Sequence, residues 1–113
     1  DAPCSASGIL RRQPDIRLHR RASDIPNLVA TQSQMLYALW PMLVPGGRLV
    51  YATCSILRAE NENVVAGFLA AHDDAQALAL SPEWGEVAGV GRQRLPGDRG
   101  MDGFYHAVIT KQA

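Results

Sequence analysis

Two cysteines are the residues with the most reactive side chains in this 113-residue sequence. Cys4 follows Pro3, and Cys54 lies between Thr53 and Ser55. A thiolate is a strong nucleophile and a metal ligand, and a thiol reacts only when its surroundings let it ionise. Two cysteines are too few for a disulfide scaffold, and they lack the CxxC spacing of zinc and redox sites. Each is therefore either a nucleophile or a buried structural residue, because cysteine is among the most buried residue types.

Charged side chains are unevenly distributed although the formal net charge is zero. A basic stretch contains Arg11, Arg12, Arg17, Arg20 and Arg21. Arginine forks suit phosphate oxygens, so this stretch is either a phosphate contact or an ordinary solvated face. The three histidines, at positions 19, 72 and 106, have no ligand spacing with one another, and we expect no metal site.

The elements that position the cysteines follow from the pattern of apolar residues. Residues 1–22 contain Gly8 and Pro14 and are predicted to form a long connection with one short helical turn. Ser23 or Asp24 can cap a helix, which Pro45-Gly46-Gly47 would end. The inward stripe of that helix comprises Leu28, Gln32, Met35, Leu36, Leu39 and Leu43.

The rest of the sequence predicts three strands and another helix. Residues 48–53 are nearly all apolar and predict a strand covered on both faces, with Cys54 at its carboxyl end. A helix follows, with Glu60 and Glu62 in its first turns and its end near His72; Val64, Val65, Phe68 and Leu69 face inward. Residues 76–80 predict a short strand, 81–99 a loop, and 104–110 a final strand.

This alternation predicts an α/β fold with helices packed on a sheet, and the length allows one small domain. No apolar run approaches the ~18 residues of a membrane span, and the N-terminus lacks the features of a signal peptide, so we expect a cytoplasmic protein. If a strand precedes Asp1, the two strands and the helix between them form a parallel crossover. Cys4 and Cys54 would then lie on the same rim of the sheet.

Six short motifs, in this order and spacing, resemble those of the Sun-type RNA methyltransferases, also called the NOL/NOP/Sun family. Among these enzymes, the similarity is greatest to bacterial ones that act on cytosine in small-subunit (16S-type) ribosomal RNA, and a transfer RNA target stays open. The motifs are Asp1-Ala2-Pro3-Cys4-Ser5, Arg11-Arg12-x-Pro14-Asp15-Ile16, Pro45-Gly46-Gly47, Tyr51-Ala52-Thr53-Cys54-Ser55, Glu60-Asn61-Glu62 and Asp102-Gly103-Phe104.

The resemblance implies a Rossmann-like class I methyltransferase fold, of which residues 1–113 would be the C-terminal portion, with the later strands of a mostly parallel sheet and flanking helices. The implied reaction is methylation of carbon 5 of cytosine in RNA, with S-adenosylmethionine as the methyl donor. The cofactor-binding half and an N-terminal RNA-binding region would lie upstream of Asp1. We therefore expect this chain alone to bind S-adenosylmethionine weakly or not at all.

The resemblance also implies roles for individual residues. Cys54 would be the nucleophile, Cys4 would assist product release, and Asp1 would lie near the cofactor. Pro3 would shape the base pocket, and Arg11 and Arg12 are expected to bind the RNA substrate. Glu60, Asn61 and Glu62 are taken as residues of a helix start, without a catalytic role.

Alternatives to this assignment stay open at the level of the sequence. In DNA cytosine-5 methyltransferases, which resemble this fold, the cysteine of the Pro-Cys motif is the nucleophile, and that cysteine corresponds here to Cys4. A noncatalytic RNA-binding module, or an inactive fragment in which both cysteines are structural, would also fit the composition.

Overall fold

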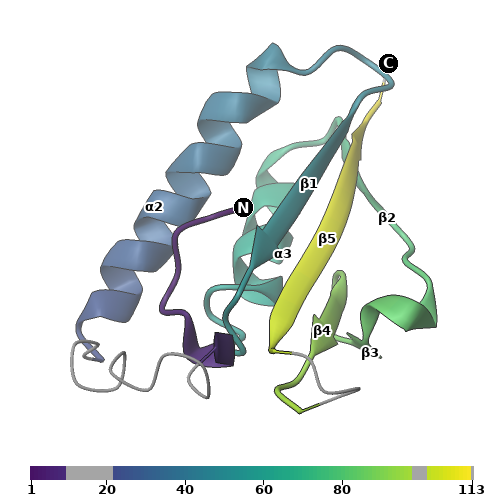
Figure 1. Ribbon diagram of the computed structural model, residues 1–113. Coiled ribbons are helices and arrows are strands. Elements are labelled where there is room, and N and C mark those ends of the chain that lie inside the picture. The colour runs from purple at the N-terminus through teal and green to yellow at the C-terminus, as the bar shows by residue number, and fades with distance from the viewer. Residues whose placement is uncertain (10–21, 98–101, 113) are drawn as a thin grey trace.

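The computed structural model describes residues 1–9, 22–97 and 102–112. A five-stranded sheet forms its centre, with α3 behind the sheet and α2 alongside β1 (Figure 1). This arrangement confirms the predicted α/β class. In chain order the elements are η1 (Ser7–Ile9), α2 (Asp24–Leu39), η2 (Trp40–Met42), β1 (Arg48–Thr53), α3 (Glu62–Ala71), β2 (Ala75–Leu78), η3 (Pro82–Trp84), β3 (Glu86–Val87), β4 (Arg92–Arg94) and β5 (Phe104–Lys111).

β5 is the central strand of the sheet although it comes last in the chain. Val108 pairs with Val50 of β1 on one side and with Leu78 of β2 on the other. β4 pairs with the first residues of β5, and β3 pairs with β4. All four pairings among the described strands are antiparallel, so the prediction of a mostly parallel sheet is wrong for this part of the chain.

The direction of β5 explains this difference. β1 and β2 are joined through α3 and run in the same direction, as expected for strands joined by a helical crossover. They do not pair with each other, because β5 lies between them and runs the opposite way. The alternation of helices and strands indicates the crossover but not the later insertion of an antiparallel strand.

The hydrophobic core lies between the helices and one face of the sheet. Tyr105, Ala107 and Ile109 alternate along β5 and are at most 1% exposed, as expected for a strand with one covered face. Trp40 packs edge to face against Phe68 of α3, with 5.1 Å between the ring centroids. The other core residues are Ala2, Leu36, Tyr51, Val64 and Val65.

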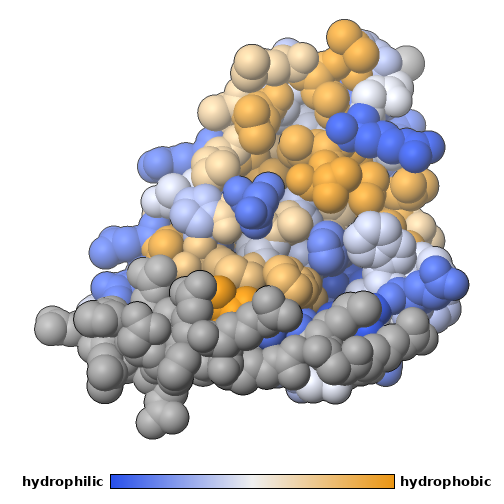
Figure 2. Space-filling view, viewed as in Figure 1, coloured by the Kyte–Doolittle hydropathy of each residue, from blue (hydrophilic) through white to orange (hydrophobic). Residues whose placement is uncertain are grey.

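The opposite face of the sheet carries apolar side chains that other described residues leave partly exposed. Val50 of β1 is 55% exposed, and Leu78 of β2 is 39% exposed. Figure 2 shows hydrophobic surface over the sheet, viewed as in Figure 1. The prediction that residues 48–53 are covered on both faces is therefore wrong for the described part of the chain, because α3 lies behind the sheet and α2 beside it.

The first long helix is shorter than its apolar stripe predicts. α2 ends at Leu39 and continues as the 3-10 turn η2, which contains Pro41. Ser23 occupies the N-cap position, but its side chain makes no capping hydrogen bond. Only Gln32 and Leu36 of the predicted stripe are buried. Beyond η2, Gly46 adopts a positive φ of 85°, which suits the predicted turn into β1.

The remaining elements match the predicted positions with one addition. α3 buries Val64, Val65 and Phe68 and ends at Ala71, as predicted. The predicted strand at 76–80 is Ala75–Leu78, and the final strand extends to Lys111. Residues 81–97, predicted as loop, instead contain η3 and the short hairpin of β3 and β4. Strands of two and three residues are too short for a readable alternation of apolar side chains.

Candidate active site

Cys4 and Cys54 meet at one end of β1, as predicted from the shared rim. Their Sγ atoms are 3.4 Å apart, well beyond the ~2.05 Å of a disulfide bond, so both are thiols. The N-terminal segment runs between α2 and β1 (Figure 1), and the Ala2 N–H donates to the Ala52 carbonyl at 2.8 Å. The spatial proximity of the two cysteines is therefore confirmed.

Gly8 joins the two cysteine-bearing segments to the start of β5. Its N–H donates to the Cys54 carbonyl at 2.8 Å, and its own carbonyl accepts from the Gly103 N–H at 2.7 Å. A Cβ atom at Gly8 would lie 2.2 Å from the Gly103 carbonyl oxygen and 2.7 Å from that of Cys54. Only glycine fits between these backbones, so Gly8 and Gly103 fix where the Cys54 loop lies.

The two thiols differ in exposure. Cys4 is buried at 7% exposure, whereas Cys54 is only partly buried. Burial is the largest cause that raises the pKa of Cys54 to about 11, followed by its hydrogen bond with Cys4 and the charge of Cys4. Cys54 is therefore protonated at neutral pH in this state of the protein, and a bound substrate or proton acceptor must shift that balance before the thiolate can react.

Glu60 bonds to the residue that follows each cysteine and was not among the predicted site residues. Its side chain is 0% exposed. Oε1 accepts from the Ser5 N–H at 2.7 Å, and Oε2 accepts from the Ser5 hydroxyl at 2.7 Å and from the Ser55 hydroxyl. The interpretation of Glu60 as a residue in the first turns of a helix is thus wrong, because α3 begins only at Glu62 and the Glu60 carboxylate points inward.

Asn61 provides a second link behind the nucleophile loop. It is 1% exposed, accepts from the Thr53 hydroxyl at 2.5 Å and donates to the Ser55 carbonyl at 2.9 Å. Gln93 of β4 also donates to the Ser55 carbonyl, at 3.1 Å. The Thr53 side chain and the Ser55 carbonyl, on either side of Cys54, are therefore held by side chains from two other segments.

The other predicted site residues have different placements. Asp1 and Pro3 are exposed, and the Pro3 carbonyl accepts from Gln32 Nε2 at 2.8 Å. Gln32 itself is 0% exposed, and its Nε2 also lies 3.4 Å from Glu60 Oε1. Arg11 and Arg12 lie outside the described residues.

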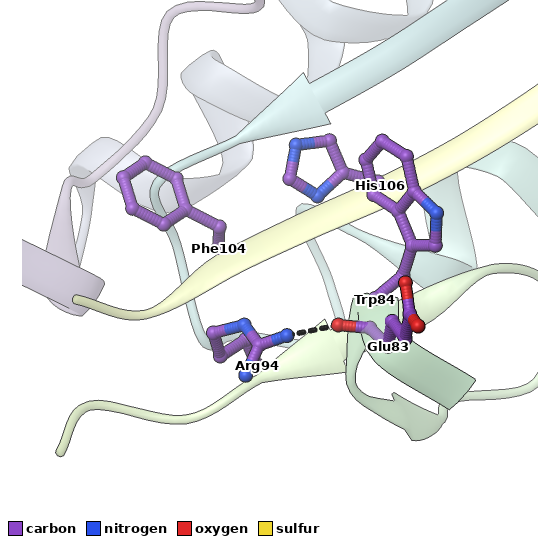
Figure 3. Close-up of a pocket in the computed structure, with 5 residues that line it drawn as sticks. All are labelled: Glu83, Trp84, Arg94, Phe104 and His106. Carbon is purple, nitrogen blue, oxygen red and sulfur yellow. Dashed lines mark hydrogen bonds between the residues drawn. The ribbon is translucent and has the colours of Figure 1, made fainter. Parts of the chain in front are cut away.

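A hollow of about 310 Å³ lies apart from the two cysteines. Figure 3 shows its lining, with the Arg94 guanidinium donating to the Glu83 carbonyl, and the Trp84 ring next to that of His106. Burial, followed by the charge of Arg94, lowers the pKa of His106, so its ring is neutral at neutral pH. Phe104 completes the lining, and its carbonyl accepts from Gln93 at 3.2 Å.

Within residues 1–9, 22–97 and 102–112, no three His, Cys, Asp or Glu side chains gather in a way that could hold a metal ion. No helix among these residues is both long and apolar enough to cross a membrane.

A family model and individual known proteins both match this chain, and they point to the same family. The family described as 16S rRNA methyltransferase RsmB/F matches residues 1–110. The ribosomal RNA small subunit methyltransferase B of Xanthomonas campestris pv. campestris is 52% identical over 111 residues, which make up 98% of this chain and 25% of that protein. The chain thus spans about a quarter of the length of the curated relatives it matches.

Solved structures agree with this match. A methyltransferase homologue protein from Pyrococcus horikoshii has a TM-score of 0.80 and 31% identity, over 100% of this chain and 37% of that one. NSun6 from Pyrococcus horikoshii with SFG has a TM-score of 0.79 and 25% identity, over 100% of this chain and 29% of that one. The predicted family is therefore confirmed, and the chain belongs to the RsmB/F family of 16S rRNA methyltransferases.

Proposed function

We propose that this chain carries the cysteine pair of an enzyme that methylates carbon 5 of a cytosine in RNA, with small-subunit ribosomal RNA as the substrate. The observation that carries the proposal is the meeting of Cys4 and Cys54, with 3.4 Å between their sulfur atoms, although 50 positions separate them in the sequence. Two thiols that lie together in a chain of an rRNA methyltransferase family are placed to act on the same substrate.

The reaction explains why a thiol is needed. Carbon 5 of cytosine is a poor nucleophile, so the Cys54 thiolate first adds to carbon 6, and the electron pair of the carbon 5–carbon 6 bond becomes available at carbon 5. Carbon 5 then would form its new bond to the methyl group while the bond from that methyl group to the sulfonium sulfur of the donor breaks, so that the donor would leave as a neutral thioether. A base removes the proton from carbon 5, the double bond reforms, and the Cys54 thiolate leaves. Covalent catalysis thereby replaces one difficult step with easier ones.

Exposure supports Cys54 rather than Cys4 as the attacking group. Cys54 is the less buried of the two and lies at the end of β1, where a base can approach from solvent. Cys4 is 7% exposed and touches Cys54, which suits a group that exchanges a proton as the adduct forms and breaks. We assign product release to Cys4.

S-adenosylmethionine is the proposed methyl donor, and it would supply an electrophilic methyl group at this rim. The structural neighbour NSun6 contains SFG, an analogue of that donor, which supports the assignment. Asp1 is exposed and precedes Ala2, which is bonded to β1, and we propose that the Asp1 carboxylate contacts the donor. A single carboxylate can contact only part of an S-adenosylmethionine molecule. We therefore propose that residues 1–113 form the C-terminal part of a Rossmann-like catalytic domain.

The RNA must present an unpaired or flipped-out cytosine, because carbon 6 is covered inside a helix. We propose that Pro3, exposed beside Cys4, shapes the pocket for that base. Arg11 and Arg12 are proposed to contact phosphates, which would position the RNA without reading its sequence.

The test uses a full-length family protein that contains this chain, incubated with S-adenosylmethionine and a small-subunit rRNA transcript. Protein linked to RNA is measured on denaturing gels, and methylcytosine by mass spectrometry of the digested RNA. We expect Cys54→Ala to abolish both the adduct and the product. Cys4→Ala should form the adduct and accumulate it, because release is slowed.

Ser33→Ala, at a partly buried residue of α2, serves as the matched control for a small substitution. Accumulation of the adduct in Cys54→Ala and its loss in Cys4→Ala would reverse the assignment of the two thiols. RNA binding without any adduct or product in the unsubstituted protein would instead favour a noncatalytic RNA-binding module.

A further inference from the structure

We propose that Glu60 is a positioning residue that holds both reactive thiols in place through the two serines that follow them. This inference rests on the proposed function of Cys4 and Cys54. Ser5 follows Cys4 and Ser55 follows Cys54, and a single carboxylate accepts hydrogen bonds from both serines. Glu60 thus bonds to the residue that follows each of the two cysteines.

The hydrogen bonds account for a carboxylate in a fully buried position. A buried carboxylate is costly unless several donors satisfy it. Here Ser5 contributes its N–H and its hydroxyl, both at 2.7 Å, and Ser55 contributes its hydroxyl. Gln32 adds a weaker contact at 3.4 Å and also donates to the Pro3 carbonyl. These donors come from three separate segments, so the carboxylate fixes their relative positions.

The backbone of Glu60 is held as well. Its carbonyl oxygen accepts from the Tyr51 hydroxyl at 2.6 Å, and Tyr51 is a buried residue of β1. Glu60 is therefore anchored to the same strand that ends at Cys54. A rigid anchor and two short side-chain bonds leave little freedom for either cysteine-bearing segment.

Electrostatics point to a geometric role rather than to activation of the nucleophile. The charge of Glu60 is among the causes that raise the pKa of Cys54, so it opposes the thiolate instead of favouring it. If Glu60 contributes to the reaction, it does so by keeping the two sulfur atoms adjacent. A displacement of about 1 Å at a reacting group can slow a reaction by about 100-fold.

The decisive variant is Glu60→Gln in the full-length protein that contains this chain. It preserves the shape and one acceptor oxygen but replaces the other acceptor by an amide that donates. We expect adduct formation in single-turnover assays to slow by about 10- to 100-fold, with the dissociation constant for RNA unchanged. Glu62→Gln is the matched control, because Glu62 is two residues away and forms an ion pair with the exposed Arg58 at 3.4 Å.

Two serine variants separate positioning from a general structural effect. Ser55→Ala should slow adduct formation, which depends on Cys54, whereas Ser5→Ala should slow adduct release, which depends on Cys4. A merely structural role for Glu60 would affect both steps equally in both variants. If Glu60→Gln does not fold, as judged by circular dichroism, these two variants decide the question.

The outcomes distinguish this inference from the proposed function. Adduct formation by Glu60→Gln at the rate of Glu62→Gln would overturn the positioning role while leaving the chemistry of Cys54 intact. A loss confined to RNA affinity would overturn it too, as would identical kinetics for Ser5→Ala, Ser55→Ala and the unsubstituted protein. Absence of an adduct in the unsubstituted protein would overturn the proposed function and, with it, this inference.

Discussion

The protonation state of Cys54 gives the most direct test of the site, and it can be measured by alkylation. The pKa of Cys54 is raised to about 11, so the thiol form is favoured up to that pH. At pH 7.5 only about 1 in 3,000 molecules would carry the thiolate, and at pH 9.5 about 1 in 30, since each pH unit below the pKa costs a factor of ten. Alkylation should therefore accelerate about 100-fold between these two values.

The assay measures the rate at which iodoacetamide modifies Cys54, using mass spectrometry of the peptide that contains it. Cys4→Ala is the informative perturbation, because it removes the hydrogen bond and the charge that help to raise the pKa of Cys54. We expect faster alkylation at pH 7.5, by tenfold for each unit of pKa decrease. The pKa should remain above its ordinary value, because burial is the largest cause and persists.

Cys4→Ser is the control that keeps a hydrogen-bonding hydroxyl at that position but does not ionise in this range. The alkylation rate of Cys54 in this variant at pH 7.5 should lie between the rates in the unsubstituted protein and in Cys4→Ala. A plateau in the alkylation rate below pH 9 in the unsubstituted protein would refute the reasoning, because it would mean that the resting site already stabilises the thiolate.

Two further substitutions test the packing that supports the site. Gly8→Ala should lower the free energy of unfolding by about 1–3 kcal/mol, measured by urea denaturation, because its Cβ meets backbone oxygens at 2.2 and 2.7 Å. Gly67→Ala is its control, because no atom beyond the adjoining backbone of α3 lies within 4 Å of the added Cβ, and we expect stabilisation by about 0.5–1 kcal/mol. An equal loss of unfolding free energy in Gly8→Ala and Gly67→Ala would contradict the steric account. Trp40→Ala should lower the free energy of unfolding by about 3–5 kcal/mol because Trp40 is 3% exposed, whereas Trp84→Ala, at 44% exposure, should lower it far less. Similar melting temperatures for the two variants would be inconsistent with this core.

The elements that the sequence predicted well are those with local periodic patterns. α3 was placed by the spacing of Val64, Val65 and Phe68, and β5 by its β-branched and aromatic residues. The proximity of Cys4 and Cys54 was also predicted, on the expectation that a strand precedes Asp1 and that the ends of neighbouring strands share a rim.

The features that the sequence did not predict depend on contacts between distant segments. Glu60 and Glu62 are equivalent in a helix-start pattern, and the bonds from Ser55 and from Ser5, which is 55 positions away, distinguish the buried carboxylate. The order of strands around β5 was missed for the same reason, since periodicity gives no strand direction. Val50 looked like a residue of a fully covered strand, yet it is 55% exposed among the described residues.

The central position of β5 has a consequence for how the site forms during synthesis. β1 and β2 cannot pair with each other in this arrangement, so the sheet closes only when residues 104–111 insert between them. Pairing between segments more than 50 positions apart is slow, because the loop must close before its contacts are gained. A growing chain therefore carries both cysteines before the strand that organises their rim has left the ribosome. During that interval the thiols would be open to oxidants and to wrong partners.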